Sequence, residues 1–382
     1  MSGVRALARA DGWVALLALT VALIGGLFIR SATLEDPRFG SLAAKQALVL
    51  LIAAGSGVGL ILVPYPRLLR RAWWLYAVAL AALLLLPWFG IVINGARRWY
   101  RLPGFYVQPS ELAKLAVIVA LAAWLRFKSK ATTLDGLLLP ALIAGVPAFL
   151  VLRQPDLGSS LVFGPILLAM CFVAGAPLRS LLVLSGLAAV ALVCSYFVLH
   201  DYQRTRVDVW LQHFTWTDDN LGRADVQAAL RGYGFQPWQA LIAIGSGGMA
   251  GFGLEQGPQN RYGFLPYRFD DYIFAVVCEE SGLLGALGLL GLQGCLVAGL
   301  LRIAARTRER FGRLLVVGVA TYLGTQSLVH AAVCTWLIPA TGLPMPLVSY
   351  GGSSTLVAVW AVALALNVSA RREPVLASDG YL

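Results

Sequence analysis

The stretch that organises this chain is Gly245–Gly282, GSGGMAGFGLEQGPQNRYGFLPYRFDDYIFAVVCEESG, in which a polar cluster runs directly into a long apolar segment. Asp270 and Asp271 stand just before that segment, and two glutamates follow about two turns later if it is helical. Most of the remaining sequence is compatible with lipid. Carboxylates at such a boundary therefore need a structural or functional reason.

The composition predicts an all-α polytopic membrane protein. Hydrophobic residues make up 59% of the 382 residues and charged residues 13%, against about 25% charged in an ordinary soluble domain. Several windows exceed the roughly 18 nearly uncharged residues that a membrane-spanning helix requires. Hydropathy predicts about ten transmembrane helices, at Trp13–Arg30, Gln46–Val63, Trp73–Ile93, Leu112–Phe127, Leu137–Leu152, Gly158–Gly175, Leu181–Leu199, Tyr272–Leu301, Leu314–Cys334 and Ser354–Val368.

These helices predict one membrane domain over residues 1–372, with a retained first helix and a disordered cytoplasmic tail at 373–382. About half of the 30 Lys and Arg residues fall in the tails and in alternate short connections, as in Arg67, Arg70 and Arg71. The positive-inside rule makes that side cytoplasmic, with both termini on it. The single long connection, residues 200–271 between helices seven and eight, is then extracytoplasmic, and its length suggests function.

Several function classes lack their sequence signals. No G-x-x-x-x-G-K-[ST] phosphate loop occurs, which argues against an ATP-driven pump and against a nucleotide cofactor. The five cysteines and three histidines have no metal-ligand spacing. No nucleic-acid partner is expected; membrane lipids are.

Other polar residues interrupt the apolar pattern. Glu111 and Lys114 share a helix face within the fourth span, where they either face a cavity or form a structural ion pair. Asp156, in Gln-Pro-Asp-Leu-Gly, lies between two spans and is equally explained as a helix N-cap. Arg97 and Arg98 lie on the non-cytoplasmic side, where guanidinium groups suit lipid head groups or a phosphorylated ligand.

Specific segments, in order along nearly the whole chain, resemble the SEDS family (shape, elongation, division and sporulation proteins). They are NGARRWYRLPGFYVQPSELAKL, RQPDLGSSL, YQRTR, QALIAIGSGG, FLPYRFDDYIFAVVCEESG and TGLPMPLVSYGGSS. Within the family, GSGG followed by LEQGPQNRYGFLP is more similar to the RodA branch than to the FtsW branch. The resemblance implies a ten-helix peptidoglycan glycosyltransferase that polymerises lipid II outside the cytoplasmic membrane, with a class B penicillin-binding protein as partner.

The resemblance also assigns residues. The family's acidic catalytic position falls on Asp271, while its usual Glu, His and Thr nearby are replaced by Tyr267, Phe269 and Asp270. Asp271 would deprotonate the acceptor hydroxyl, with Asp270 as a second candidate, and basic residues would stabilise the departing pyrophosphate. The residues expected to bind substrate or pyrophosphate are Arg97, Arg98, Glu111, Lys114, Asp156, Arg204, Arg206, Gln239 and Ser349. A divalent cation, Mg or Mn, could share that task with Asp156 or Glu111; the sequence leaves this open.

Two other function classes stay open at this stage. A lipid II flippase or transporter also suits intramembrane charges and broken outer segments. A scaffold that has lost catalysis and only recruits a transpeptidase is compatible with the changes at Tyr267, Phe269 and Asp270. Polymer formation in detergent, where no leaflet exists to flip between, discriminates the enzyme from the transporter.

Overall fold

The computed structural model describes residues 7–34, 39–93, 95–103, 105–127, 134–217 and 219–371. Within these ranges, nine helices are long and apolar enough to cross a membrane. They are α2 (Gly12–Thr33), α3 (Leu42–Leu62), α4 (Pro66–Phe89), α6 (Leu134–Arg153), α7 (Leu157–Ala174), α8 (Leu178–Ser195), α13 (Ile273–Arg306), α14 (Arg310–Cys334) and α15 (Gly352–Ala370). The remaining predicted span, Leu112–Phe127, corresponds to the shorter helix α5 (Pro109–Leu125), of 17 residues.

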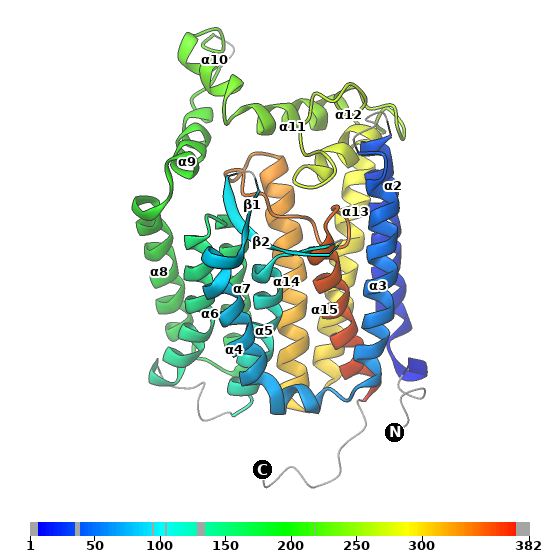
Figure 1. The fold of residues 1–382 in the computed structure, drawn as a ribbon, viewed down its shortest axis with the longest axis vertical. Helices are drawn as coiled ribbons and strands as arrows, with labels where there is room; N and C mark the ends of the chain where they lie inside the picture. The colour runs from blue at the N-terminus through cyan, green and yellow to red at the C-terminus, as the bar shows by residue number, and fades with distance from the viewer. Residues whose placement is uncertain are drawn as a thin grey trace.

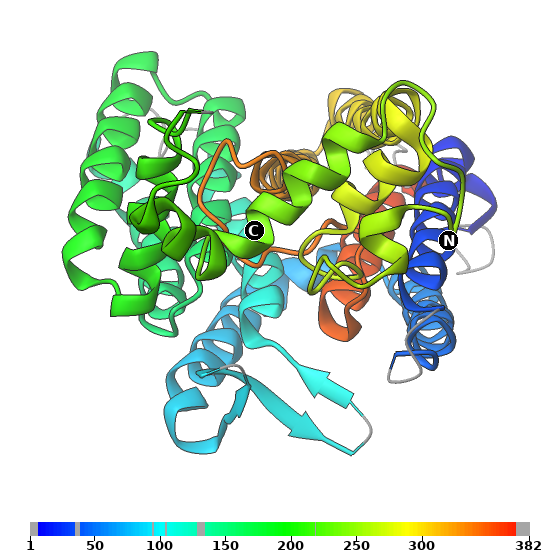
Figure 2. The same ribbon diagram turned by 90° about the horizontal axis from the view of Figure 1, so that it is seen from above.

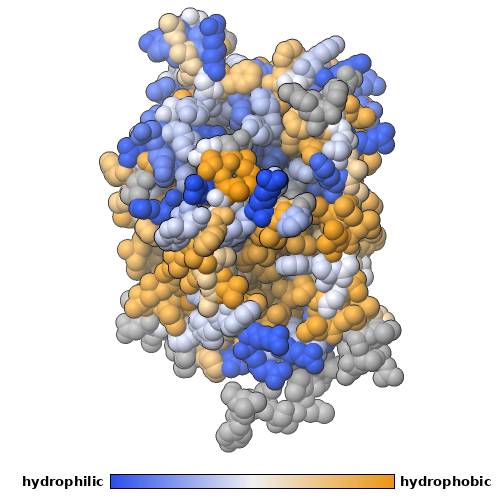
Figure 3. Space-filling view, in the orientation of Figure 1, coloured by the Kyte–Doolittle hydropathy of each residue, from blue (hydrophilic) through white to orange (hydrophobic). Residues whose placement is uncertain are grey.

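The long helices stand side by side in one bundle (Figure 1). Helices α5, α14 and α15 are mostly buried, whereas α3, α4 and α8 expose most of their side chains. The exposed side chains on these outer helices are largely apolar. On the face shown in Figure 3, hydrophobic residues form a broad band across the bundle, with hydrophilic residues gathered toward its two ends. A belt of this kind is what a helix bundle in lipid requires, and the prediction of a multi-pass membrane protein is confirmed.

The segment between α4 and α5 differs from the prediction. The predicted span Trp73–Ile93 ends early, because α4 stops at Phe89 and the chain turns into β1 (Ile91–Ile93). Strands β2 (Ala96–Leu102) and β3 (Phe105–Val107) continue a three-stranded antiparallel sheet in the order β1-β2-β3, which projects from the bundle (Figure 2). The β-branched run Ile-Val-Ile suits an extended strand as well as a helix end, so hydropathy alone misplaced the boundary.

Residues 200–271 cover one end of the bundle, mainly as α9 (Asp201–His213), α10 (Ala224–Arg231), α11 (Phe235–Ser246) and α12 (Pro258–Arg261). Helix α11 crosses over the bundle in the view from above (Figure 2). The described chain enters the bundle at the start of α2 and leaves it at the end of α15, both at the opposite end (Figure 1). The predicted tail, 373–382, lies outside the described residues.

Helix α13 is broken at Gly282, whose φ of 63° and ψ of −168° only glycine adopts readily. The loop after α11 replaces the lost helical hydrogen bonds: the backbone N–H groups of Leu283 and Leu284 donate to Gly248 and Met249, while the loop donates back to the carbonyls of residues 279 and 280. A Cβ on Gly251 would lie 2.2 Å from one of these carbonyls. The outer connection is therefore joined by its backbone to the half-helix Ile273–Ser281.

Candidate functional site

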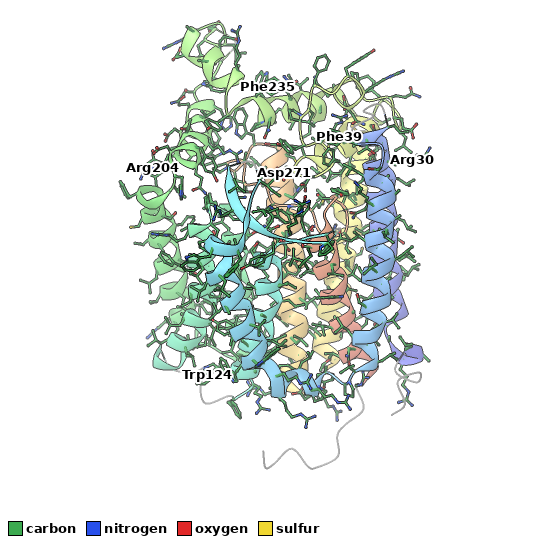
Figure 4. All side chains as sticks on the ribbon, in the orientation of Figure 1. Arg30, Phe39, Trp124, Arg204, Phe235 and Asp271 are labelled. Atoms are coloured by element: carbon green, nitrogen blue, oxygen red, sulfur yellow. The ribbon has the colours of Figure 1, made fainter. Side chains whose placement is uncertain are left out.

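Asp271 is held by a tight turn at the start of α13. The carbonyl of Tyr267 accepts hydrogen bonds from the backbone N–H groups of Asp270, Asp271 and Tyr272, at 3.1, 3.1 and 3.3 Å. The side chain of Asp271 keeps partial access to solvent and lies in the upper half of the bundle, below α11 (Figure 4). The turn at residues 267–272 thus holds both aspartates at the end of the helix bundle that residues 200–271 cover.

The neighbouring replacements have structural roles in this turn. Phe269 is buried, and its ring packs against Phe39 at 4.9 Å and Tyr350 at 6.0 Å between centroids. Arg268 is also buried and donates from Nε to the carbonyl of Ala32 at 2.8 Å. Tyr267 is 41% exposed. Two side chains that precede Asp271 therefore anchor the turn: Arg268 to α2, and Phe269 to Phe39 and to the segment before α15.

Opposing effects act on the charge of Asp271. Burial raises the pKa of this carboxyl to about 6, while Arg206 and Arg98 act to lower it and Asp156 to raise it. A carboxylate with a pKa near 6 is ionised at neutral pH and still basic enough to accept a proton. For Asp270, burial together with the Asp271 and Glu111 carboxylates raises the pKa well above its ordinary value. The two adjacent carboxyls therefore differ in surroundings: two arginines act on Asp271, and two other carboxylates act on Asp270.

A narrow crevice of about 20 Å³, with room for about one water molecule, lies between β2, the start of α7, α9 and residues 339–341. Its polar lining includes Arg98, Tyr202, Arg206 and Thr341. The next residue, Gly342, lies against Asp271, since a Cβ placed there would be 3.6 Å from Oδ2 of the carboxylate. The crevice therefore places two guanidinium groups and a hydroxyl next to the segment that abuts Asp271.

The structure separates the two neighbouring arginines of β2. Arg98 donates from Nε to the carbonyl of Gln154 at 3.1 Å, and from Nη2 to the carbonyl of Pro155 and to the hydroxyl of Tyr202. Arg97 is exposed and donates to the carbonyl of Pro87 near the end of α4. Alternate residues of a strand face opposite ways, and only Arg98 is directed to the crevice.

The two arginines of α9 separate in the same way. Arg206 lines the crevice, lies 5.8 Å from the ring centroid of Tyr202, and has its Nη1 3.4 Å from the carbonyl of Ala340. Arg204 turns back along the chain and donates to the carbonyls of Tyr196 and Phe197. Of the four predicted arginines, the structure thus brings Arg98 and Arg206 together and directs Arg97 and Arg204 elsewhere.

Glu111 and Lys114 form a fully buried network below the turn. Nζ of Lys114 lies 2.7 Å from Oε1 of Glu111 and 2.9 Å from the side-chain oxygen of Gln326. The hydroxyl of Tyr322 donates to Glu111 at 3.2 Å, and the amide of Gln326 donates to the carbonyl of Pro344 at 2.8 Å. The pair thereby ties α5 and α14 to the irregular segment before α15, which borders Asp271.

Asp156 is the N-cap of α7, accepting from the backbone N–H of Ser159 at 3.1 Å, and its other oxygen accepts from the side-chain amide of Gln108 at 3.0 Å. Both oxygens of Asp156 and both of Glu111 are thus occupied by protein donors. In the part of the chain that the structure describes, no group of three or more His, Cys, Asp or Glu residues could hold a metal ion. This donor set does not fit a resident divalent cation at Asp156 or Glu111.

Ser349 bonds directly to the turn, whereas Gln239 lies on α11. The hydroxyl of Ser349 donates to the carbonyl of Asp270 at 2.8 Å and accepts from the backbone N–H of Met345 at 2.8 Å. Gln239 is half-buried in the middle of α11. Ser349 therefore supports the backbone of the site, and Gln239 belongs to the helix that crosses over it (Figure 2).

The two glutamates of the opening stretch serve the outer connection. Glu279 accepts from the backbone N–H groups of Gln259 and Asn260 at the start of α12, and Glu280 accepts from Ser31 and from the amide of Asn260. A polar cavity of about 510 Å³ opens beside Ser31 and Asn260. These carboxylates fix α12 and the end of α2 to the half-helix Ile273–Ser281, which follows Asp271.

Comparison with known proteins identifies the family. The sequence matches the family described as cell cycle protein, which covers FtsW, RodA and SpoVE, over residues 12–373. The chain belongs to this family. It is 34% identical to the probable peptidoglycan glycosyltransferase FtsW of Geobacter sulfurreducens, with 96% of this chain and 97% of that protein covered. It is 32% identical to the peptidoglycan glycosyltransferase MrdB of Escherichia coli, with 95% and 94% covered.

Solved structures agree with this FtsW/RodA/SpoVE membership. The RodA crystal structure of Thermus thermophilus is similar with a TM-score of 0.68 at 30% identity, covering 96% of this chain and 98% of that one. A chain from a peptidoglycan synthase complex, described for its coordination of polymerization and crosslinking, gives a TM-score of 0.78 at 33% identity and covers 95% and 98%. Relatives of both the FtsW and the RodA branch are found, so the predicted leaning toward RodA stays a prediction.

Sequence reasoning missed several residues of this FtsW/RodA family site. Tyr202 holds Arg98 in place, and Tyr322 and Gln326 complete the network of Lys114. Thr341 lines the crevice with a buried hydroxyl. Two of these residues carried a sequence signal. Tyr202 begins the family-like segment YQRTR, and Thr341 begins the Gly- and Pro-rich break TGLPMP, where irregular backbone at membrane depth must be buried or line a wet cavity.

Proposed function

We propose that this chain is a peptidoglycan glycosyltransferase that polymerises lipid II into glycan strands. The observation that carries the proposal is the placement of Asp271 beside a crevice lined by Arg98 and Arg206, in a chain whose curated relatives are named peptidoglycan glycosyltransferases. Transfer of a sugar from a polyprenyl pyrophosphate to a hydroxyl needs a base for the hydroxyl and positive charge for the leaving group. This site supplies both on one side of one turn.

In the proposed reaction, the carboxylate of Asp271 accepts the proton of the GlcNAc 4-hydroxyl of the acceptor lipid II. The hydroxyl oxygen forms a bond to the anomeric carbon of the MurNAc donor from the opposite face. The bond from that carbon to the pyrophosphate oxygen breaks, and the oxygen leaves with the electron pair. Arg98 and Arg206 stabilise the charge that develops on it, as fixed basic groups do most effectively in a site with little water.

Asp270 is assigned a different role from Asp271. Burial and the carboxylates of Asp271 and Glu111 raise its pKa well above the ordinary value, whereas Arg206 and Arg98 act to lower the pKa of Asp271. Its backbone carbonyl is tied to Ser349. We therefore assign the base to Asp271 and a structural role to Asp270.

The proposed orientation places this reaction at the outer face of the cytoplasmic membrane. The exposed basic residues Arg67, Arg70 and Arg71 begin α4 at the end of the bundle away from Asp271 (Figures 1 and 4), and the positive-inside rule makes that end cytoplasmic. The similarity to a chain from a peptidoglycan synthase complex supports a class B penicillin-binding protein as partner. The GSGG and LEQGPQNRYGFLP segments support a role in cell elongation and shape.

A polymerisation assay with purified lipid II in detergent tests the proposal. Wild-type protein should form glycan strands, and Asp271→Asn should lose roughly 10²- to 10⁴-fold of the rate while keeping its fold. Asp270→Asn should keep most of it. Asp225→Asn, an exposed carboxylate of α10, is the matched control and should match wild type. Substantial synthesis by Asp271→Asn would exclude this base, and leaflet exchange in vesicles without synthesis in detergent would favour transport.

A further inference from the structure

Thr341 carries a buried hydroxyl for which the described residues supply no hydrogen-bond partner. The residue is 6% exposed, and its Oγ1 is buried with no hydrogen-bond partner among the described residues. Burying a hydroxyl without a partner destabilises a folded protein. Native structures keep such groups rarely, and each one needs an explanation.

The location of Thr341 supplies that explanation. It lines the crevice with Arg98 and Arg206, and it directly precedes Gly342, which lies against the Asp271 carboxylate. The polar neighbours are already engaged: the hydroxyl of Tyr202 accepts from Arg98 at 3.1 Å and lies 3.2 Å from the carbonyl of Pro155. Among the described residues, the Thr341 hydroxyl is therefore an unengaged donor at the crevice that Arg98 and Arg206 line.

The backbone around Thr341 is fixed well enough to aim this hydroxyl. Arg206 reaches the carbonyl of Ala340, His330 contacts the carbonyl of Leu343 at 2.7 Å, and Gln326 donates to the carbonyl of Pro344. The side chain of Thr341 packs against Gly158, where even an added Cβ would lie 2.9 Å from it. Irregular backbone is thus held by three side chains, and the hydroxyl loses little freedom when a ligand arrives.

We propose that the Thr341 hydroxyl donates a hydrogen bond to the diphosphate of the polyprenyl-linked donor, at the oxygen that leaves the anomeric carbon. This inference rests on the proposed function and adds a residue to its site. No proton is transferred: the leaving oxygen takes the electron pair of the broken bond, and the hydroxyl stabilises its charge beside Arg98 and Arg206. A hydrogen bond to a charged group in such a position contributes roughly 10- to 100-fold to the rate.

The test compares Thr341→Val, which keeps the shape and removes only the hydroxyl, with Thr341→Ser, which keeps the hydroxyl. Thr321→Val is the matched control, because its hydroxyl already bonds the carbonyl of Val317 within α14. In the detergent assay, Thr341→Val should lower kcat/KM roughly 10- to 100-fold, whereas Thr341→Ser and Thr321→Val should stay within a few-fold of wild type. The unfolding temperature of Thr341→Val should equal or exceed that of wild type, because an unpaired buried hydroxyl is gone.

A second experiment measures the affinity of the same proteins for farnesyl diphosphate and for inorganic pyrophosphate. Because binding needs no turnover, it tests the role of Thr341 separately from the proposed polymerase activity. Thr341→Val should weaken both ligands about tenfold, since both carry the diphosphate; tighter binding of the farnesyl ligand by wild type identifies the lipid-linked source. Unchanged binding and rate in Thr341→Val would overturn the role of Thr341 while leaving Asp271 as the base. An equal loss in Thr341→Ser would overturn it as well, because shape and not the hydroxyl would then matter.

Discussion

Removing the Lys114 amine should destabilise the protein strongly, because it would leave a buried carboxylate without its cation. Both side chains of the pair are 0% exposed, and Nζ of Lys114 lies 2.7 Å from Oε1 of Glu111. In Lys114→Met the chain keeps similar length, but Glu111 retains only the Tyr322 hydroxyl at 3.2 Å. Breaking a buried pair by removing one partner costs about 3–5 kcal/mol, and we expect the free energy of unfolding to fall by that amount.

The double variant Glu111→Gln with Lys114→Met should recover most of this loss, because no unpaired charge remains and the new amide can still accept from Tyr322. Denaturant-induced unfolding of the purified protein in detergent measures the free energies, with Lys45→Met, an exposed lysine of α3, as the control. A Lys114→Met protein within about 1 kcal/mol of wild type would refute the reasoning, and so would a double variant no more stable than the single one.

Three further predictions concern the crevice and the helix break. Burial raises the pKa of Asp271 to about 6, and only the ionised carboxylate accepts a proton. The polymerisation rate should therefore fall about tenfold per pH unit below about pH 6. A rate that stays constant down to about pH 5 would contradict this. Arg98→Gln should lower kcat about 10²-fold, while Arg97→Gln should be nearly neutral; equal effects would contradict the crevice geometry. Gly251→Ala should lower the free energy of unfolding by at least about 2 kcal/mol, because φ of Gly251 is 75° and an added Cβ would meet a carbonyl. Gly288→Ala is the control, because a Cβ on Gly288 would enter open space and should cause no such loss. Thermal unfolding compares the two variants.

Much of the fold could be predicted from the sequence because hydropathy depends mainly on composition within a window. All ten predicted spans correspond to helices. Hydropathy places the ends of the helices less well. Helix α4 ends at Phe89, where the chain turns into β1, and the pairing of β1 with β2 depends on partners that no single window contains. Helix α13 was correctly expected near Tyr272, but its break at Gly282 depends on backbone donors from the loop after α11.

The site could be predicted only in part, because sequence gives residue types and not directions. Arg97 and Arg98 are equivalent in composition, yet successive residues of a strand face opposite ways, and the register of β2 decides which one reaches the crevice. Arg204 and Arg206 are two apart on a helix and do not share a face, so they too separate. The sequence marks Thr341 as the start of an irregular segment, but its unpartnered hydroxyl is found only when the partners of every buried donor are accounted for.

The turn from Tyr267 to Tyr272 places two adjacent carboxyl groups in different surroundings. On the closed side, Asp270 faces the Glu111 network and its backbone is held by Ser349, so substitutions there should appear first as lost stability. On the open side, Asp271 faces Arg98 and Arg206, so substitutions there should appear first as lost rate. An unpartnered buried hydroxyl reduces stability unless a ligand supplies its partner. Because the Thr341 hydroxyl lies on the open side, a diphosphate-bearing ligand should stabilise this protein against unfolding more than it stabilises Thr341→Val.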